Sequence, residues 1–251
     1  MADAMATTAE TPNPPAKSFL ARLIGVFFSP GATFADIAQH PDFIAPLVLA
    51  IVASVAVTET MLAKIGMERI VRMSIERSSR ASSMSATQMD QAVQQGAKIG
   101  GIIAHVGGVI GPGIFLLILA GIGILILVPV FGAETNFKTV FSVTCYAYMP
   151  AILGALVTIP VMIFGDPETF NPQTPMPSNP AFFMDQQTAS KALYAFASSV
   201  DLFTMWLLVM LAMGLSAASA YKVKTRSVFL VYFGLWALWV VGKVGWAALA
   251  G

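Results

Sequence analysis

The chain has 251 residues, of which 57% are apolar and 11% are charged, and its mean hydropathy is +0.76. Soluble domains carry about 25% charged residues, so this composition indicates a membrane protein with several spans, and the net charge of +1 gives no electrostatic basis for binding nucleic acid. The single cysteine, Cys145, excludes an internal disulfide, and the two histidines, His40 and His105, match no metal-site spacing. We therefore expect an all-α polytopic membrane helix bundle without a cofactor or a nucleic-acid partner.

The N-terminal residues 1–16 are polar and lack the apolar core of a signal peptide, so we expect a disordered tail followed by a membrane domain over 17–250. Within that domain, residues 17–41 predict an amphipathic collar made of two helical pieces. The apolar stretch SFLARLIGVFF in the first piece is too short to cross a bilayer, and we expect Arg22 to reach the lipid headgroups. A membrane-surface anchor and a surface for docking a partner are both open interpretations of this collar.

The junction between the two pieces of the collar has a capping pattern. Ser29 is expected to be the N-cap of the second piece, with Pro30 at its first helical position. Pro41 is expected to end this piece before the first span begins.

Five segments are apolar over the roughly 20 residues that a spanning helix requires. These spans are predicted at 43–65, 106–131, 138–164, 200–221 and 227–250. After the first span, MERIVRMSIERSSR predicts an amphipathic surface helix, followed by a Ser/Gln-rich connector at 82–95. Residues 165–199 contain five prolines and are expected to be extended and polyproline-like.

The distribution of lysine and arginine around the spans predicts a cytoplasmic N-terminus. Cations lie in the tail, in the 132–138 loop and in the 222–226 turn, whereas the 165–199 loop has one lysine and three acidic residues. The basic 66–98 loop disagrees with this orientation, so its side of the membrane stays open.

Four ionisable residues in or beside the spans are the strongest candidates for a functional cluster, because charge in hydrocarbon is costly. Glu59, Lys243, Asp201 and His105 are predicted at one depth, about 25 Å from the cytoplasmic face at 1.5 Å per residue. An ion pair between Glu59 and Lys243 would tie the first span to the last. The alternative is that each side chain reaches the outer headgroups independently.

Glycines and prolines are the other candidate positions within the spans. Gly107 and Gly111 form a small-xxx-small pair that predicts close helix packing. Pro112 is expected to kink the second span, and Pro150 and Pro160 the third. The sequence contains no HExxH, GxSxG, GxxxxGK[ST] or GxGxxG motif, so no enzymatic activity is expected.

Three stretches of the chain resemble the Yip family of Ypt/Rab-interacting membrane proteins. They are FFSPGATFADIAQHPDFIAPL, FGAETNFKTVFSVTCYAYMPAIL, and the last two spans with their basic turn at 200–245. The resemblance implies five spans, a cytoplasmic N-terminus and a non-enzymatic scaffold, in a compact Ala-rich form like that of bacterial members. Eukaryotic members bind prenylated Rab GTPases, but this chain lacks their long N-terminal region and Asp-Leu-Tyr-Gly-Pro-type stretch, which argues against Rab binding.

The sequence therefore favours an integral membrane protein that acts as a scaffold or accessory subunit through helix–helix and lipid contacts. Its expected partners are the lipid bilayer and other membrane proteins or a second copy of the chain. A small transporter or channel component is the alternative, because helices broken by proline and glycine line the substrate sites of transporters.

Overall fold

The computed structural model of the chain consists of helices, with no strand among the residues it describes. The described residues are 15–76, 78, 83–166, 170–172, 174–185 and 188–249. The expected N-terminal tail therefore lies outside the described residues, apart from residues 15 and 16.

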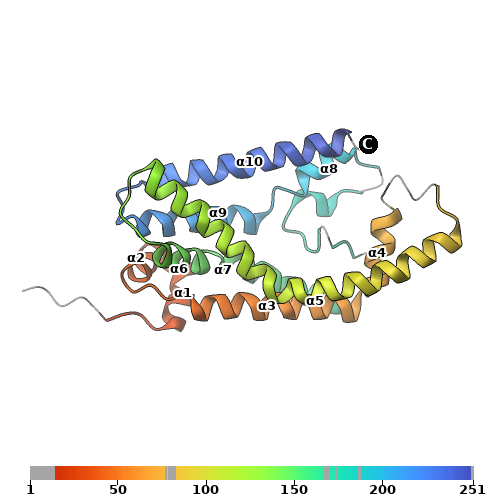
Figure 1. Ribbon diagram of the computed structural model, residues 1–251, viewed down its shortest axis with the longest axis horizontal. Helices are drawn as coiled ribbons and strands as arrows, with labels where there is room; N and C mark the ends of the chain where they lie inside the picture. Colours follow the sequence, from red (N-terminus) through yellow and green to blue (C-terminus); the bar gives the residue numbers. More distant parts are fainter. Residues whose placement is uncertain are drawn as a thin grey trace, which may run out of the picture.

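The helices follow one another along the chain with short connections. They are α1 (Phe19–Phe28), α2 (Pro30–Gln39), α3 (Ile44–Lys64), α4 (Met67–Glu76), α5 (Ala86–Leu125), the π turn η2 (Ile126–Val130), α6 (Phe137–Ala147), α7 (Met149–Phe164), the 3-10 turn η3 (Pro180–Phe183), α8 (Lys191–Ala197), α9 (Leu202–Ala218) and α10 (Thr225–Leu249). In the elongated bundle that they form, α1 and α2 lie at one end and α4 and α8 at the other, while α3 and α10 run along opposite edges (Figure 1).

Four helical segments within the described residues are long and apolar enough to cross a membrane, and a bent pair makes a fifth. The four are α3, α5 with η2, α6 with α7, and α10. The fifth is α8 with α9, which qualify only together and meet at an angle of 48°. The predicted all-α polytopic bundle is confirmed. The fourth predicted span, 200–221, corresponds to α9, which is long enough to qualify only together with α8.

Helix α5, which carries the second predicted span, begins at Ala86, well before the apolar run predicted at 106–131. Ser85 and Gln88 form a capping box, in which Ser85 Oγ accepts from the Gln88 amide at 3.2 Å and Gln88 Oε1 accepts from the Ser85 amide at 2.8 Å. The connector expected at 82–95 is therefore wrong from Ala86 onward. The predicted amphipathic helix α4 is confirmed. Helix α5 packs closely against its apolar face, because a Cβ at Gly96 of α5 would lie only 2.7 Å from the Val71 side chain.

Proline disrupts the third span near the predicted position. The helix breaks at Tyr148, between α6 and α7, two residues before Pro150. Pro150 has no N–H to donate to the carbonyl four residues earlier, and its ring crowds the preceding turn. The 165–199 loop, in contrast, is not simply extended as expected: it contains η3 and α8, and Ala181, Tyr194 and Ala197 form a small apolar cluster.

The centre of the bundle is α6, in which every residue from Thr139 to Ala147 is buried. Helix α2 packs against α6 and α9, so that Phe34 and Ile37 have no exposed surface. Gly214 of α9 allows this close packing, because a Cβ there would lie 3.1 Å from the Phe34 ring. The second piece of the collar is therefore part of the core of the bundle and does not merely lie on the membrane surface.

Candidate functional site

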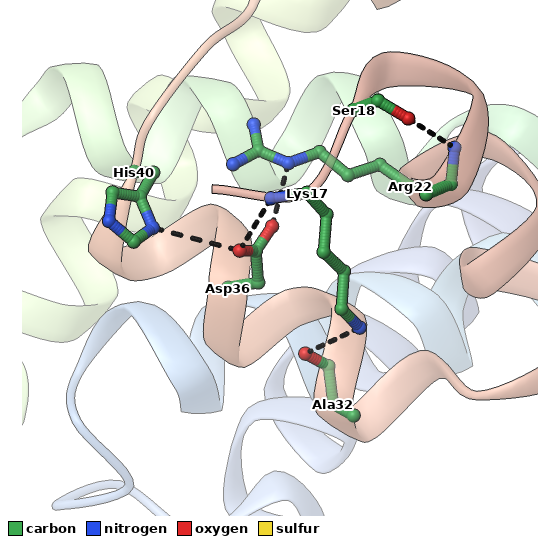
Figure 2. Close-up of polar contacts among 7 residues, drawn as sticks. Lys17, Ser18, Arg22, Ala32, Asp36 and His40 are labelled. Carbon is green, nitrogen blue, oxygen red and sulfur yellow. Dashed lines mark hydrogen bonds and ion pairs between the residues drawn. The ribbon is translucent and has the colours of Figure 1, made fainter. Parts of the chain in front are cut away.

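A buried ion pair joins the two helices of the collar (Figure 2). Arg22 Nε donates to Asp36 Oδ2 at 2.7 Å, and the side chains of Arg22 and Asp36 are 3% and 12% exposed. The other carboxylate oxygen, Oδ1, accepts from the Lys17 amide at 3.1 Å and lies 3.6 Å from His40 Nδ1. The expectation that Arg22 reaches the headgroups is therefore wrong, because its charge is neutralised inside the protein.

The local structure of α1 explains why this arginine points inward. Ser18 caps α1 by accepting from the Ala21 amide at 3.3 Å, and the face of α1 that carries Arg22, Gly25 and Val26 is then buried against the bundle. A Cβ at Gly25 would overlap Thr33 Oγ1, so glycine allows α1 and α2 to approach closely. The opposite face of α1 is apolar and exposed, as a helix at the membrane interface requires, through Leu20, Ile24 and Phe28.

The junction with α2 differs in one detail from its prediction. Ser29 is the N-cap residue and Pro30 is the first helical residue, as expected, but the Ser29 side chain makes no capping hydrogen bond. The fixed φ of proline is compatible with the start of a helix. The N–H that Pro30 lacks would have no acceptor within the helix at this position, so its absence costs little.

The polar cluster around Arg22 contains buried atoms that lack a hydrogen-bond partner. Arg22 Nη2, Tyr146 Oη and Thr33 Oγ1 are all in this state. The guanidinium carbon of Arg22 lies 5.9 Å from the centroid of the Tyr146 ring, which places the charge against α6. We infer that these contacts of Arg22 hold α1 against α2 and α6, and so fix the collar on the bundle.

The four ionisable residues predicted to cluster divide into separate groups. Glu59 Oε1 lies 3.2 Å from Nε2 of His105, and both side chains are about half exposed, at 53% and 56%. His105 Nδ1 also lies 2.7 Å from the Gly101 carbonyl oxygen. Two of the four residues therefore meet, between α3 and α5, and Glu59 is paired with His105.

Lys243 makes different contacts from those predicted. Its Nζ donates to Ser198 Oγ at 3.0 Å and Ser199 Oγ at 2.9 Å, and it lies 5.4 Å from the centroid of the Trp239 ring. The predicted Glu59–Lys243 ion pair does not form, because the hydroxyls at the end of α8 are the groups within reach of α10.

Asp201 has a capping role at the bend between α8 and α9. Its Oδ1 accepts from the amides of Phe203 at 2.9 Å and Thr204 at 3.1 Å, at the N-terminus of α9. Ser178 Oγ donates to the other oxygen, Oδ2. Asp201 therefore fixes the start of α9 and ties the loop before it to the helix.

The glycine pair predicted to pack helices makes no close contact within this chain. A Cβ at Gly107 or Gly111 would meet no other part of the chain within 4 Å. The neighbouring Gly108 faces α3 instead, where a Cβ would lie 3.0 Å from Thr58 Oγ1. Close packing also occurs at Gly154, where a Cβ would lie 2.8 Å from the ring of Phe203 on α9.

A cavity of about 270 Å³ lies where α3, α5 and the start of α7 meet. Gly107, Gly111 and Pro112 line it from α5, and Ser54 and Thr58 line it from α3. Tyr148, at the break between α6 and α7, also lines it, together with alanines and with the larger apolar side chains Val57, Phe115 and Ile152. Pro150 is buried two residues farther along and does not line the cavity. The hydroxyls of Ser54 and Thr58 are not among the predicted site groups, although their i, i+4 spacing places the two side chains on one helical face.

An exposed ion pair links α4 to α5 beyond the spans. Arg72 Nη2 lies 2.8 Å from Asp90 Oδ1, and the two side chains are 45% and 60% exposed. The hydrogen bond with Asp90 raises the pKa of the Arg72 guanidinium above its ordinary value. Water screens such a pair, so it is the exposed counterpart of the buried pair in the collar.

The described residues contain no group of three or more His, Cys, Asp or Glu side chains that is placed to hold a metal ion. Comparison with known proteins gives one finding: the family model of the Yip1 domain matches residues 24–247. No curated protein and no solved structure matches the chain.

Proposed function

Since this chain belongs to the Yip1 domain family, we propose that it is a non-enzymatic scaffold or accessory subunit of the membrane in which it is embedded. It would act through contacts of its helices with lipid and with the spans of other proteins or of a second copy. We further propose that the membrane is a bacterial inner membrane and that the N-terminus is cytoplasmic.

The exposed glycines of α10 are the observation that carries this proposal. Gly234, Gly242 and Gly245 are exposed, and a Cβ at any of them would meet no other part of the chain within 4 Å. Gly234 and Gly245 lie about three turns apart, which places them on one face of the helix. Small residues on a lipid-facing helix let the backbone of another span approach closely, and this approach supplies most of the packing energy between spans.

The low burial of the edge helices supports the same proposal. Only 17% of the most apolar stretch of α3, and the same share in α10, is buried inside the bundle. Both helices run along the edges of the bundle (Figure 1), so most of their apolar stretches are available to lipid or to a partner.

Site-directed photocrosslinking in native membranes tests the proposal. A photoreactive amino acid at Leu238, which is 70% exposed on α10, is expected to form protein adducts, whereas the same group at the fully buried Leu116 is not. Gly234→Ile should abolish the adducts, and Gly101→Ile, at an equally open position on α5, should leave them unchanged. Adducts with lipid alone, together with a monodisperse monomer in mild detergent, would contradict a scaffold role.

Reporter fusions test the proposed orientation. A cytoplasmic N-terminus and five spans place the 165–199 loop outside and the 222–226 turn in the cytoplasm. A compartment-specific reporter, such as alkaline phosphatase, is expected to be active when fused in the first segment and inactive in the second. Activity at both positions would overturn the five-span orientation.

A small transporter is the second candidate, and the broken span α8–α9 favours it. Transporters place substrate sites at discontinuous helices, and α8 and α9 form a discontinuous pair with a bend of 48°. Flux assays in liposomes test this candidate: transport that Glu59→Gln abolishes would favour it over the scaffold, and the absence of flux across a panel of ions and small solutes would remove its support.

A further inference from the structure

The cavity between α3, α5 and α7 is separate from the ion pairs and from the exposed face of α10. Its rim includes Gly107 and Phe115, which are exposed on the outside of the bundle within the apolar part of α5. The cavity therefore opens toward the region that lipid occupies.

Three hydroxyl groups line this cavity without a hydrogen bond to any described residue: those of Ser54, Thr58 and Tyr148. Several other hydroxyls in the spans are satisfied by their own helices. Thr60 Oγ1, for example, donates to the Ala56 carbonyl at 2.7 Å, and Thr144 Oγ1 donates to the Val140 carbonyl at 2.8 Å. A hydroxyl without a partner in hydrocarbon is costly, so these three groups favour a ligand that carries a hydrogen-bonding atom.

A hydroxyl group can both donate and accept a hydrogen bond. A ligand group that does both, such as an alcohol, therefore matches the three hydroxyls of this cavity.

The charge and size of the cavity narrow the ligand further. None of its lining residues is ionisable at neutral pH, which excludes a charged headgroup. Small residues, alanine on α3 and α7 and glycine on α5, leave a space of about 270 Å³. A cavity of about 150 Å³ is enough for a benzene molecule, so this space admits a hydroxyl group together with a ring or a short length of chain.

From these observations we propose that the cavity binds a neutral, hydroxyl-bearing lipid that enters from the bilayer. The hydroxyl of the lipid exchanges hydrogen bonds with Ser54, Thr58 and Tyr148, and its apolar body leaves between α3 and α5. This site is independent of the proposed scaffold role, because it uses the interior of the bundle and the scaffold uses the exposed face of α10.

Photolabelling with two matched probes tests the proposal. The full chain in phosphatidylcholine nanodiscs is irradiated with a diazirine-bearing hexadecanol or with the corresponding diazirine-bearing hexadecane. The alcohol is expected to label peptides of α3 and α5 about three- to tenfold more than the alkane, because only the alcohol gains hydrogen bonds in the cavity. Equal labelling by the two probes would overturn the proposal.

Matched variants locate the labelling in the cavity. Gly111→Leu fills the space and should remove the preference for the alcohol, while Gly113→Leu, at an open position of the same helix outside the cavity, should keep it. Tyr148→Phe, which removes one hydroxyl and keeps the ring, should reduce the preference if Gly111→Leu does not fold. A preference that survives both Gly111→Leu and Tyr148→Phe would refute this site, and crosslinking from Leu238 is read separately, so failure here leaves the scaffold proposal standing.

Discussion

Removal of Asp36 is expected to release the collar from the bundle. In Asp36→Ala, the Arg22 guanidinium stays buried at 3% exposure without its counter-ion, and the Lys17 amide loses its acceptor. Breaking a buried ion pair by removing one partner costs about 3–5 kcal/mol, because an uncompensated charge remains inside the protein. If the collar opens as a unit, this loss corresponds to an increase of about 150- to 5,000-fold in the open fraction of α1 and α2.

Amide hydrogen exchange of the protein in nanodiscs measures this opening. Amides of residues 19–39 that exchange through collar opening should accelerate by that factor in Asp36→Ala, while those of α9 should change much less. The double variant Arg22→Met with Asp36→Leu should recover most of the protection, because apolar groups of similar size replace a buried pair at little cost.

The exposed ion pair supplies the matched control. Asp90→Ala removes the partner of Arg72, which lies at 2.8 Å in the exposed pair against 2.7 Å in the buried one, so exchange in α4 should rise by a few-fold at most. If Asp36→Ala and Asp90→Ala accelerate exchange in their own helices equally, or if Asp36→Ala leaves the collar protected, burial does not control the strength of the Arg22 pair and the reasoning is wrong.

Two further predictions concern helix contacts. Gly154→Ala should lower the free energy of unfolding in detergent by about 1–3 kcal/mol, because the new methyl group overlaps a ring on α9. Gly113→Ala, in open space, should leave this free energy unchanged or raise it by up to about 1 kcal/mol. Equal effects of the two substitutions would argue against the α7–α9 contact. A double-mutant cycle between Glu59 and His105 should give a coupling energy below about 1 kcal/mol, because both side chains are half exposed. The cycle between Glu59 and Lys243 should give no coupling energy. A larger coupling in the second cycle than in the first would show that the Glu59–Lys243 ion pair forms after all.

Several features of this fold follow from short stretches of sequence. The spans are predictable because hydrocarbon requires about 20 consecutive apolar residues, and α3 and α10 lie where their runs predict. Pro30 at the start of α2 and the break before Pro150 follow from the geometry of proline, which acts within one turn of its own position. The start of α5 at Ala86 also has a local signal, because Ser85 and Gln88 are spaced as a capping box. The polar residues around them favour the prediction of a connector instead.

The partners of the polar side chains depend instead on how the helices are rotated and where they cross. The sequence around Arg22 is equally amphipathic whether the arginine faces headgroups or the interior of the protein. Only the docking of α1 against α2 and α6 brings Asp36 within 2.7 Å of Arg22. Two other spans carry a nitrogen-bearing side chain predicted at the depth of Glu59, namely Lys243 and His105. The packing of α3 on α5 determines that His105 is the partner of Glu59. The apolar runs determine that this chain crosses the membrane several times, because each run is long enough to meet hydrocarbon by itself. The pairings and the cavity arise only in the assembled bundle, because they join residues that no local pattern relates.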